Sequence, residues 1–127
     1  MMNIEELNAL SYKIIGCAFR VHSQLGPGLL ESTYEVCLEY ELRRVGLNVE
    51  RQKALPVVYD NLQLDAGYRI DLLVEESIIL ELKSVDQIAP IHKAQLLTYL
   101  KLSGLPLGLL LNFNVTDMKQ GITRLIL

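Results

Sequence analysis

The chain of 127 residues has a formal net charge of −3, and half of its residues are hydrophobic. This length is that of one ordinary domain with a sizeable core, so we expect a single domain over residues 1–127. The acidic balance argues against a protein that coats nucleic acid nonspecifically, and no apolar run approaches the roughly 18–20 residues of a membrane span.

The N-terminus and the two cysteines favour a cytoplasmic protein. Residues 1–6 lack the basic region and the apolar block of a signal peptide. Cys17 and Cys37 lie far apart in sequence, each inside a helical pattern. Buried free thiols in a reducing compartment fit this arrangement, and we therefore expect a cytoplasmic location.

The first part of the chain predicts two helices. Asn3 can cap the first helix, whose apolar residues keep helical spacing to about Leu25 before Gly26-Pro27-Gly28 ends it. A second helix is predicted from about Leu29 to Val45, with Gly46 as its C-terminal residue.

Two polar residues lie on the apolar stripes of these helices. A half-buried histidine bonded to backbone is the commoner interpretation of His22. Glu31, in the first turn of the second helix, shares a face with Tyr34, Leu38 and Leu42. Such a glutamate ordinarily complements the helix dipole, yet a carboxylate on a packed face needs a partner. We therefore expect this helix to lie across an acidic face of the sheet, with Glu31 aimed at a metal.

Strands follow, centred on one hairpin. Residues Val49 to Tyr59 predict a strand interrupted at Pro56, at an edge or a bulge, and Asp60-Asn61 predicts a turn. Between Tyr68 and Ser84, apolar and polar residues alternate in two runs, as in half-buried strands. One face of this hairpin, from Ile70 to Leu82, is then aliphatic.

The register of this hairpin brings two carboxylates together. A three-residue connection, Glu75-Glu76-Ser77, keeps charge off the aliphatic face. It sets Asp71 opposite Glu81, with roughly 4.5–5.5 Å between their Cβ atoms, and Arg69 opposite Lys83. Two carboxylates at this separation repel unless a proton or a cation lies between them. A divalent metal with oxygen ligands is the natural occupant, within reach of Lys83.

The remaining pattern adds a helix and two strands. The third helix spans about Pro90 to Ser103, with Gln95 and Tyr99 one turn apart on its polar stripe. Strands are predicted at Leu107 to Phe113 and at Ile122 to Leu127. This order of elements predicts an α/β fold, with a mixed sheet and helices packed on it.

An acid, a hairpin and then Glu-x-Lys resemble the motif of the PD-(D/E)XK nuclease superfamily. Asp71 and Glu81-Leu82-Lys83 supply these residues here, and Gln95-x-x-x-Tyr99 is similar to the helix motif of RecB-like and λ-exonuclease-like members. The resemblance implies a restriction-endonuclease-like mixed β-sheet core flanked by helices.

The chain resembles one branch of that superfamily more closely, the GxxExxY protein family of bacteria and archaea, from about Ile14 to Leu127. Gly28-Leu-Leu-Glu31-Ser-Thr-Tyr34 is similar to its signature. Further landmarks are Val21-His22, Leu25-Gly26-Pro27-Gly28, Gln52, Pro56-Val57, Tyr59, Asp71, Glu81-Leu82-Lys83, His92, Gln95, Tyr99-Leu100-Lys101 and Asn112-Phe113. Asn114 stands where a glycine commonly follows Asn-Phe.

The resemblance implies a nuclease that uses Mg²⁺ (or Mn²⁺) to hydrolyse phosphodiester bonds of nucleic acid, DNA more than RNA. Asp71 and Glu81 would hold the metal, helped by the carbonyl of Leu82, and Glu31 would complete its shell. Lys83 would orient the attacking water or offset charge on the phosphorane. The implied substrate-binding residues are Gln95, Tyr99, His22 and Arg69, although for Arg69 a plain salt bridge with a neighbouring carboxylate is an equal alternative.

Two other functions stay open. One is a catalytically silent nucleic-acid-binding or adaptor protein on a nuclease fold, which the acidic net charge keeps in view. The other is a structural or oligomerising domain, since the apolar excess suits a homodimer. Titration with Mg²⁺ or Mn²⁺ distinguishes the structural alternative from the other two functions, because a structural domain predicts no site-specific response to the metal.

Overall fold

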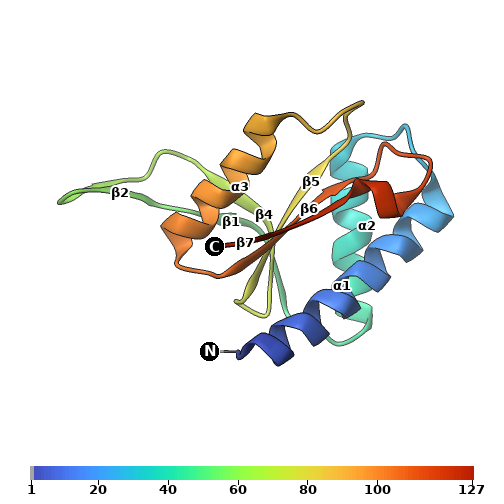
Figure 1. Ribbon diagram of the computed structural model, residues 1–127, viewed down its shortest axis with the longest axis horizontal. Helices are drawn as coiled ribbons and strands as arrows, with labels where there is room; N and C mark the ends of the chain where they lie inside the picture. Colours follow the sequence, from blue (N-terminus) through green and yellow to red (C-terminus); the bar gives the residue numbers. More distant parts are fainter. Residues whose placement is uncertain (1) are drawn as a thin grey trace.

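A mixed five-stranded sheet forms the centre of the computed structural model, which describes residues 2–127 (Figure 1). Its strands lie in the order β1-β4-β5-β6-β7, and only β5 and β6 run parallel. The strands are β1 (Val49–Ala54), β4 (Arg69–Val74), β5 (Ile78–Lys83), β6 (Leu107–Asn112) and β7 (Ile122–Ile126). The predicted α/β fold with a mixed sheet is confirmed.

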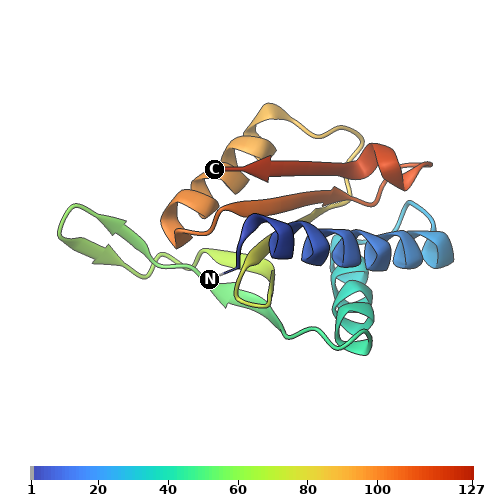
Figure 2. The same ribbon diagram turned by 60° about the horizontal axis from the view of Figure 1, so that its bottom comes forward.

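Helices lie on both faces of this sheet (Figure 2). They are α1 (Ile4–Leu25), α2 (Glu31–Arg44) and α3 (Pro90–Ser103), close to the predicted bounds. At the start of α1 the side chains of Asn3 and Glu6 accept hydrogen bonds from each other's backbone N–H, at 2.8 and 3.1 Å, which satisfies two otherwise free donors. Within residues 2–127, none of the helices is both long and apolar enough to cross a membrane.

The face of the sheet that is covered by α1 and α2 is aliphatic. Leu72 and Leu80, paired across β4 and β5, are fully buried with Leu38 and Leu42 of α2. Burying side chains of this size contributes about 1.5–3 kcal/mol each. The expectation that α2 lies across the acidic face is therefore wrong: the apolar stripe of the helix gains more by packing on the aliphatic face.

The opposite face packs on α3. Ile79 of β5 and Leu110 of β6 are buried there against Leu96 and Leu100. Because β5 has neighbours on both edges and helices on both faces, all of its residues except Lys83 are buried.

Strand alternation breaks where β1 pairs with β4. The pairs Arg51–Leu72 and Lys53–Ile70 flank Gln52, whose φ of 54° is left-handed. Beyond this kink Ile70 is buried in the cluster around α3, not with Leu72. The prediction that Ile70 belongs to the aliphatic face is therefore wrong: the pairing of β4 with β5 ends at Leu72 and Leu80, so Ile70 lies beyond the paired part of the hairpin.

A separate two-stranded hairpin, β2 (Val57–Tyr59) and β3 (Leu62–Leu64), projects away from the sheet (Figures 1 and 2). The predicted turn at Asp60-Asn61 joins its strands. Strand β3 was not anticipated, since three residues are too few to display an alternation.

The 3-10 helix η1 (Met118–Gly121) brings the chain back against the end of β6. A Cβ atom at Gly121 would overlap the carbonyl oxygen of Asn112. A side chain larger than hydrogen at position 121 therefore requires the backbone to move.

We predict that Gly121→Ala lowers the free energy of unfolding by at least about 2 kcal/mol, the scale of overpacking in a closed site. Gly16→Ala is the matched control: apart from its chain neighbours and the backbone of its own helix, no atom lies within 4 Å of a Cβ at this position in α1, and alanine raises helix stability by up to about 1 kcal/mol. Urea unfolding measures both. Equal stability of the two variants would contradict the close approach.

Candidate functional site

The β4–β5 hairpin has the predicted register. Val74 pairs with Ile78 across Glu75-Glu76-Ser77, and the pairing runs to Leu72 and Leu80. Beyond that pair, carboxylate side chains replace the backbone ladder.

Asp71 and Glu81 each accept a hydrogen bond from the backbone of the other strand. Asp71 Oδ2 accepts the N–H of Leu82 at 2.8 Å, and Glu81 Oε2 accepts the N–H of Asp71 at 2.9 Å. Glu81 is only 5% exposed, and Asp71 is half-buried. We call these two residues the acidic pair. The predicted adjacency of the two carboxylates is thus present.

Both carboxyl groups of the acidic pair resist ionisation. Burial, and then the charge of Asp71, raises the pKa of Glu81 to about 8. Burial also raises the pKa of Asp71 to about 6, although the hydrogen bond from Leu82 opposes this rise. A cation placed between the two groups would relieve both effects.

The donor set fits a hard divalent cation. Carboxylate and carbonyl oxygens are the ligands that Mg²⁺ and Mn²⁺ prefer, and each carboxylate oxygen has a second lone pair beside its hydrogen bond. Among residues 2–127, no group of three His, Cys, Asp or Glu side chains is arranged to enclose a metal. Water or substrate would therefore supply the rest of the shell.

Lys83 and Glu31 lie within electrostatic reach of the acidic pair. Burial raises the pKa of Glu81 and of Glu31, and the charge of half-buried Lys83 opposes that rise in both. Glu31 is an exposed residue, but the protein atoms around its carboxyl group still displace some of the solvent, and this desolvation raises its pKa. Glu31 in turn raises the pKa of Asp71 and of Glu81. The first residue of α2 thus approaches the pair from the end of the helix.

Tyr34 holds the loop that delivers Glu31. Its hydroxyl donates to the carbonyl of Gly26 at 2.6 Å and accepts the N–H of Leu29 at 3.1 Å. Its ring stacks on Phe113 with centroids 4.7 Å apart. Ser84 Oγ, just beyond Lys83 on β5, donates to the carbonyl of Leu29 at 2.7 Å. The loop between α1 and α2 is therefore tied to the end of β5.

Glu35 and Gln52 are further neighbours of the acidic pair. The sequence marks Gln52 only as a landmark of the family resemblance and gives Glu35 no role. Buried Glu35 accepts hydrogen bonds from Arg51 Nε at 2.8 Å and from Gln52 Nε2 at 2.9 Å. Gln52 Nε2 also contacts Asp71 Oδ1 at 3.3 Å. The helical spacing between Glu31 and Glu35 was the available signal.

An open cleft lies beside these groups. Its volume is about 600 Å³. It is lined by Leu30, Glu31, Ser32, Glu35, Arg51, Gln52 and Asp71. Asp71 is thus accessible from the start of α2.

Helix α3 approaches the acidic pair from the opposite face. Tyr99 is buried and packs edge-on against Tyr68 at 6.5 Å. Burial, and then the charges of Glu81 and Asp71, raise the pKa of its hydroxyl. Gln95 is exposed and shares with Tyr99 the lining of a cavity of about 380 Å³.

Arg69 and His22 stand apart from these contacts. Arg69 is exposed on β4 opposite Ala54 of β1, and it forms no ion pair in the described part of the chain. The pairing of β4 with β5 does not extend to Arg69 and Lys83. His22 is buried, and its Nε2 donates to the carbonyl of Val115 at 2.6 Å. The backbone-bonded interpretation of His22 is confirmed.

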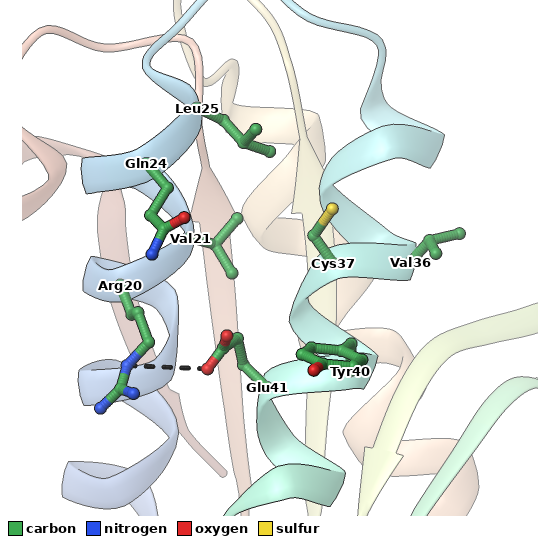
Figure 3. Close-up of a pocket in the computed structure, with 8 residues that line it drawn as sticks. All are labelled: Arg20, Val21, Gln24, Leu25, Val36, Cys37, Tyr40 and Glu41. Atoms are coloured by element: carbon green, nitrogen blue, oxygen red, sulfur yellow. Dashed lines mark ion pairs between the residues drawn. The ribbon is translucent and has the colours of Figure 1, made fainter.

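A further cavity, of about 360 Å³, lies between α1 and α2 (Figure 3). Its walls are mostly apolar, and the carboxylate of Glu41 forms an ion pair there with Arg20 at 3.6 Å. The cavity has no residue in common with the acidic pair or the cleft beside it.

Comparison with known proteins gives one match. A family model described as the PD-(D/E)XK nuclease superfamily matches residues 8–125, which include every side chain of the candidate site. No curated protein and no solved structure matches the chain.

We predict that the metal-free protein loses stability as the pH rises from about 4 to about 8. The folded chain, with raised carboxyl pKa values, holds more protons in this range than the unfolded chain, so the free energy of unfolding falls with pH. Each tenfold change in proton affinity is worth about 1.4 kcal/mol. Urea unfolding in a chelating buffer should show a flatter profile for Glu81→Gln, whereas exposed Glu76→Gln should keep the native one. A native-like slope in Glu81→Gln would contradict this assignment.

Proposed function

The chain belongs to the PD-(D/E)XK nuclease superfamily, and from this premise we propose that it is a divalent-metal-dependent nuclease acting on DNA in preference to RNA. The observation that carries the proposal is the acidic pair followed by Lys83 on β5. Within the superfamily we assign the chain to the GxxExxY branch, on the signature from Gly28 to Tyr34, and we treat residues 1–127 as one nuclease-like domain.

Asp71 and Glu81 would hold Mg²⁺ or Mn²⁺, together with the backbone carbonyl of Leu82. Such a cation, when bound, polarises a phosphodiester and makes a water more acidic. The buried position of Glu81 strengthens its attraction for a cation, because the surrounding protein screens charge less than water does. Glu31 would approach the same cation from the start of α2 through a bridging water.

Lys83 and the polar residues of α3 would act on the phosphate. Lys83 brings a positive charge to the edge of the acidic pair, where it can orient a water and offset charge on the scissile group. Tyr99 lies on the α3 side of the pair and Gln95 one turn before it, so both can donate hydrogen bonds to phosphate oxygens. Arg69 is exposed and free to contact a phosphate.

The second candidate is a catalytically silent nucleic-acid-binding or adaptor protein. One observation favours it: the net charge of −3 provides no broad attraction for a polyanion. Cleavage assays on single- and double-stranded DNA and RNA with Mn²⁺ distinguish the two, since an adaptor binds without cleaving.

We predict that Mn²⁺ stabilises the native chain and that Glu81→Ala abolishes this effect. Ligand that binds only the folded state raises its stability by about 2.7 kcal/mol at a concentration 100 times Kd. Thermal unfolding with and without Mn²⁺ measures the shift. An undiminished shift in Glu81→Ala would place the metal elsewhere.

We predict that Lys83→Met reduces DNA cleavage at least about 100-fold, the usual cost of losing one group that stabilises developing charge. Methionine retains an apolar stem, so folding and Mn²⁺ binding should persist. Lys13→Met, at an exposed position of α1, is the matched control. Near-native cleavage by Lys83→Met would remove this lysine from the mechanism.

A further inference from the structure

Gln52 has a left-handed backbone in the middle of a strand. Its φ is 54°, although Arg51 and Lys53 on either side both pair with β4. The other non-glycine residues with positive φ in residues 2–127 are Asp60, Glu75 and Glu76, and all three lie in hairpin turns. This conformation is unfavourable for a residue with a Cβ, so the surrounding contacts must hold Gln52 in it.

The side chain of Gln52 shows which contacts these are. Its Nε2 donates to Glu35 Oε1 at 2.9 Å and to Asp71 Oδ1 at 3.3 Å. Glu35 is held from its other oxygen by Arg51 Nε at 2.8 Å, and Asp71 from its other oxygen by the N–H of Leu82 at 2.8 Å. One amide group therefore lies between two carboxylates that are each fixed on the far side.

We propose that Gln52 is a positioning residue for the metal ligand Asp71, and that it anchors this ligand to buried Glu35 of α2. The inference rests on the proposed function, because it takes Asp71 as a ligand of the cation. The left-handed backbone turns the amide between the two carboxylates, where an extended backbone at position 52 would direct the side chain differently. The helix thus orients the ligand through Gln52, without contributing Glu35 to the metal.

Partners of this kind orient metal ligands, and their loss weakens metal affinity about 10- to 100-fold. Calorimetric titration with Mn²⁺ measures this without any cleavage step. We expect that decrease in Gln52→Met, which keeps the length of the side chain and loses the donor, and also in Gln52→Gly. Both variants lose the donor to buried Glu35, but Gln52→Gly should be more stable than Gln52→Met, because glycine adopts positive φ freely.

Glu76→Gly is the matched control, since it changes a residue with φ of 51° in the β4–β5 turn and should leave Mn²⁺ affinity unchanged. Asp71→Ala should abolish binding. If Asp71→Ala does so while Gln52→Met binds like the native chain, the positioning role of Gln52 is overturned and the metal site stands. Absence of Mn²⁺ binding by the native chain overturns the proposed metal site and this role together. A Gln52→Gly variant that loses stability but keeps its affinity assigns Gln52 a purely structural role.

Discussion

Two backbone N–H groups that find their acceptors in the carboxylates of Asp71 and Glu81 hold the candidate site together. Each carboxylate accepts an N–H of the opposite strand, so neither side chain can rotate away without leaving a backbone donor unpaired near the core. Two carboxyl groups that resist ionisation are thereby held side by side. The stability of the hairpin and the attraction for a cation have the same origin, because the geometry that satisfies the backbone also brings the two carboxyl groups together.

The surrounding elements meet at this point from distant parts of the chain. Strand β5 contributes Glu81 and Lys83, the start of α2 brings Glu31, and α3 brings Tyr99 from the other face. Because most of these contacts are distant in sequence, the site is complete only when the sheet and both helical layers are in place. A site built on a single local motif would not depend on the complete fold in this way.

Local patterns were enough to predict the hairpin and not enough to predict what packs on it. The alternation and the turn Glu75-Glu76-Ser77 fixed the register, and with it the adjacency of the acidic pair. Glu31 led to a wrong prediction of the sheet face on which α2 packs. Burial of the apolar stripe of the helix contributes more free energy than the contacts of one charged residue at its end. The left-handed φ of Gln52 has no sequence signal, because glutamine adopts it only when tertiary contacts impose it.

The projecting hairpin of β2 and β3 divides the molecule into regions of unequal cooperativity. No residue of either strand is buried, and the hairpin forms a sheet of its own. Opening it exposes little new apolar surface, so this arm can fray and re-form many times without global unfolding. Its amide hydrogens therefore exchange with solvent through local fluctuations, whereas those of β5 exchange only when the whole sheet unfolds cooperatively.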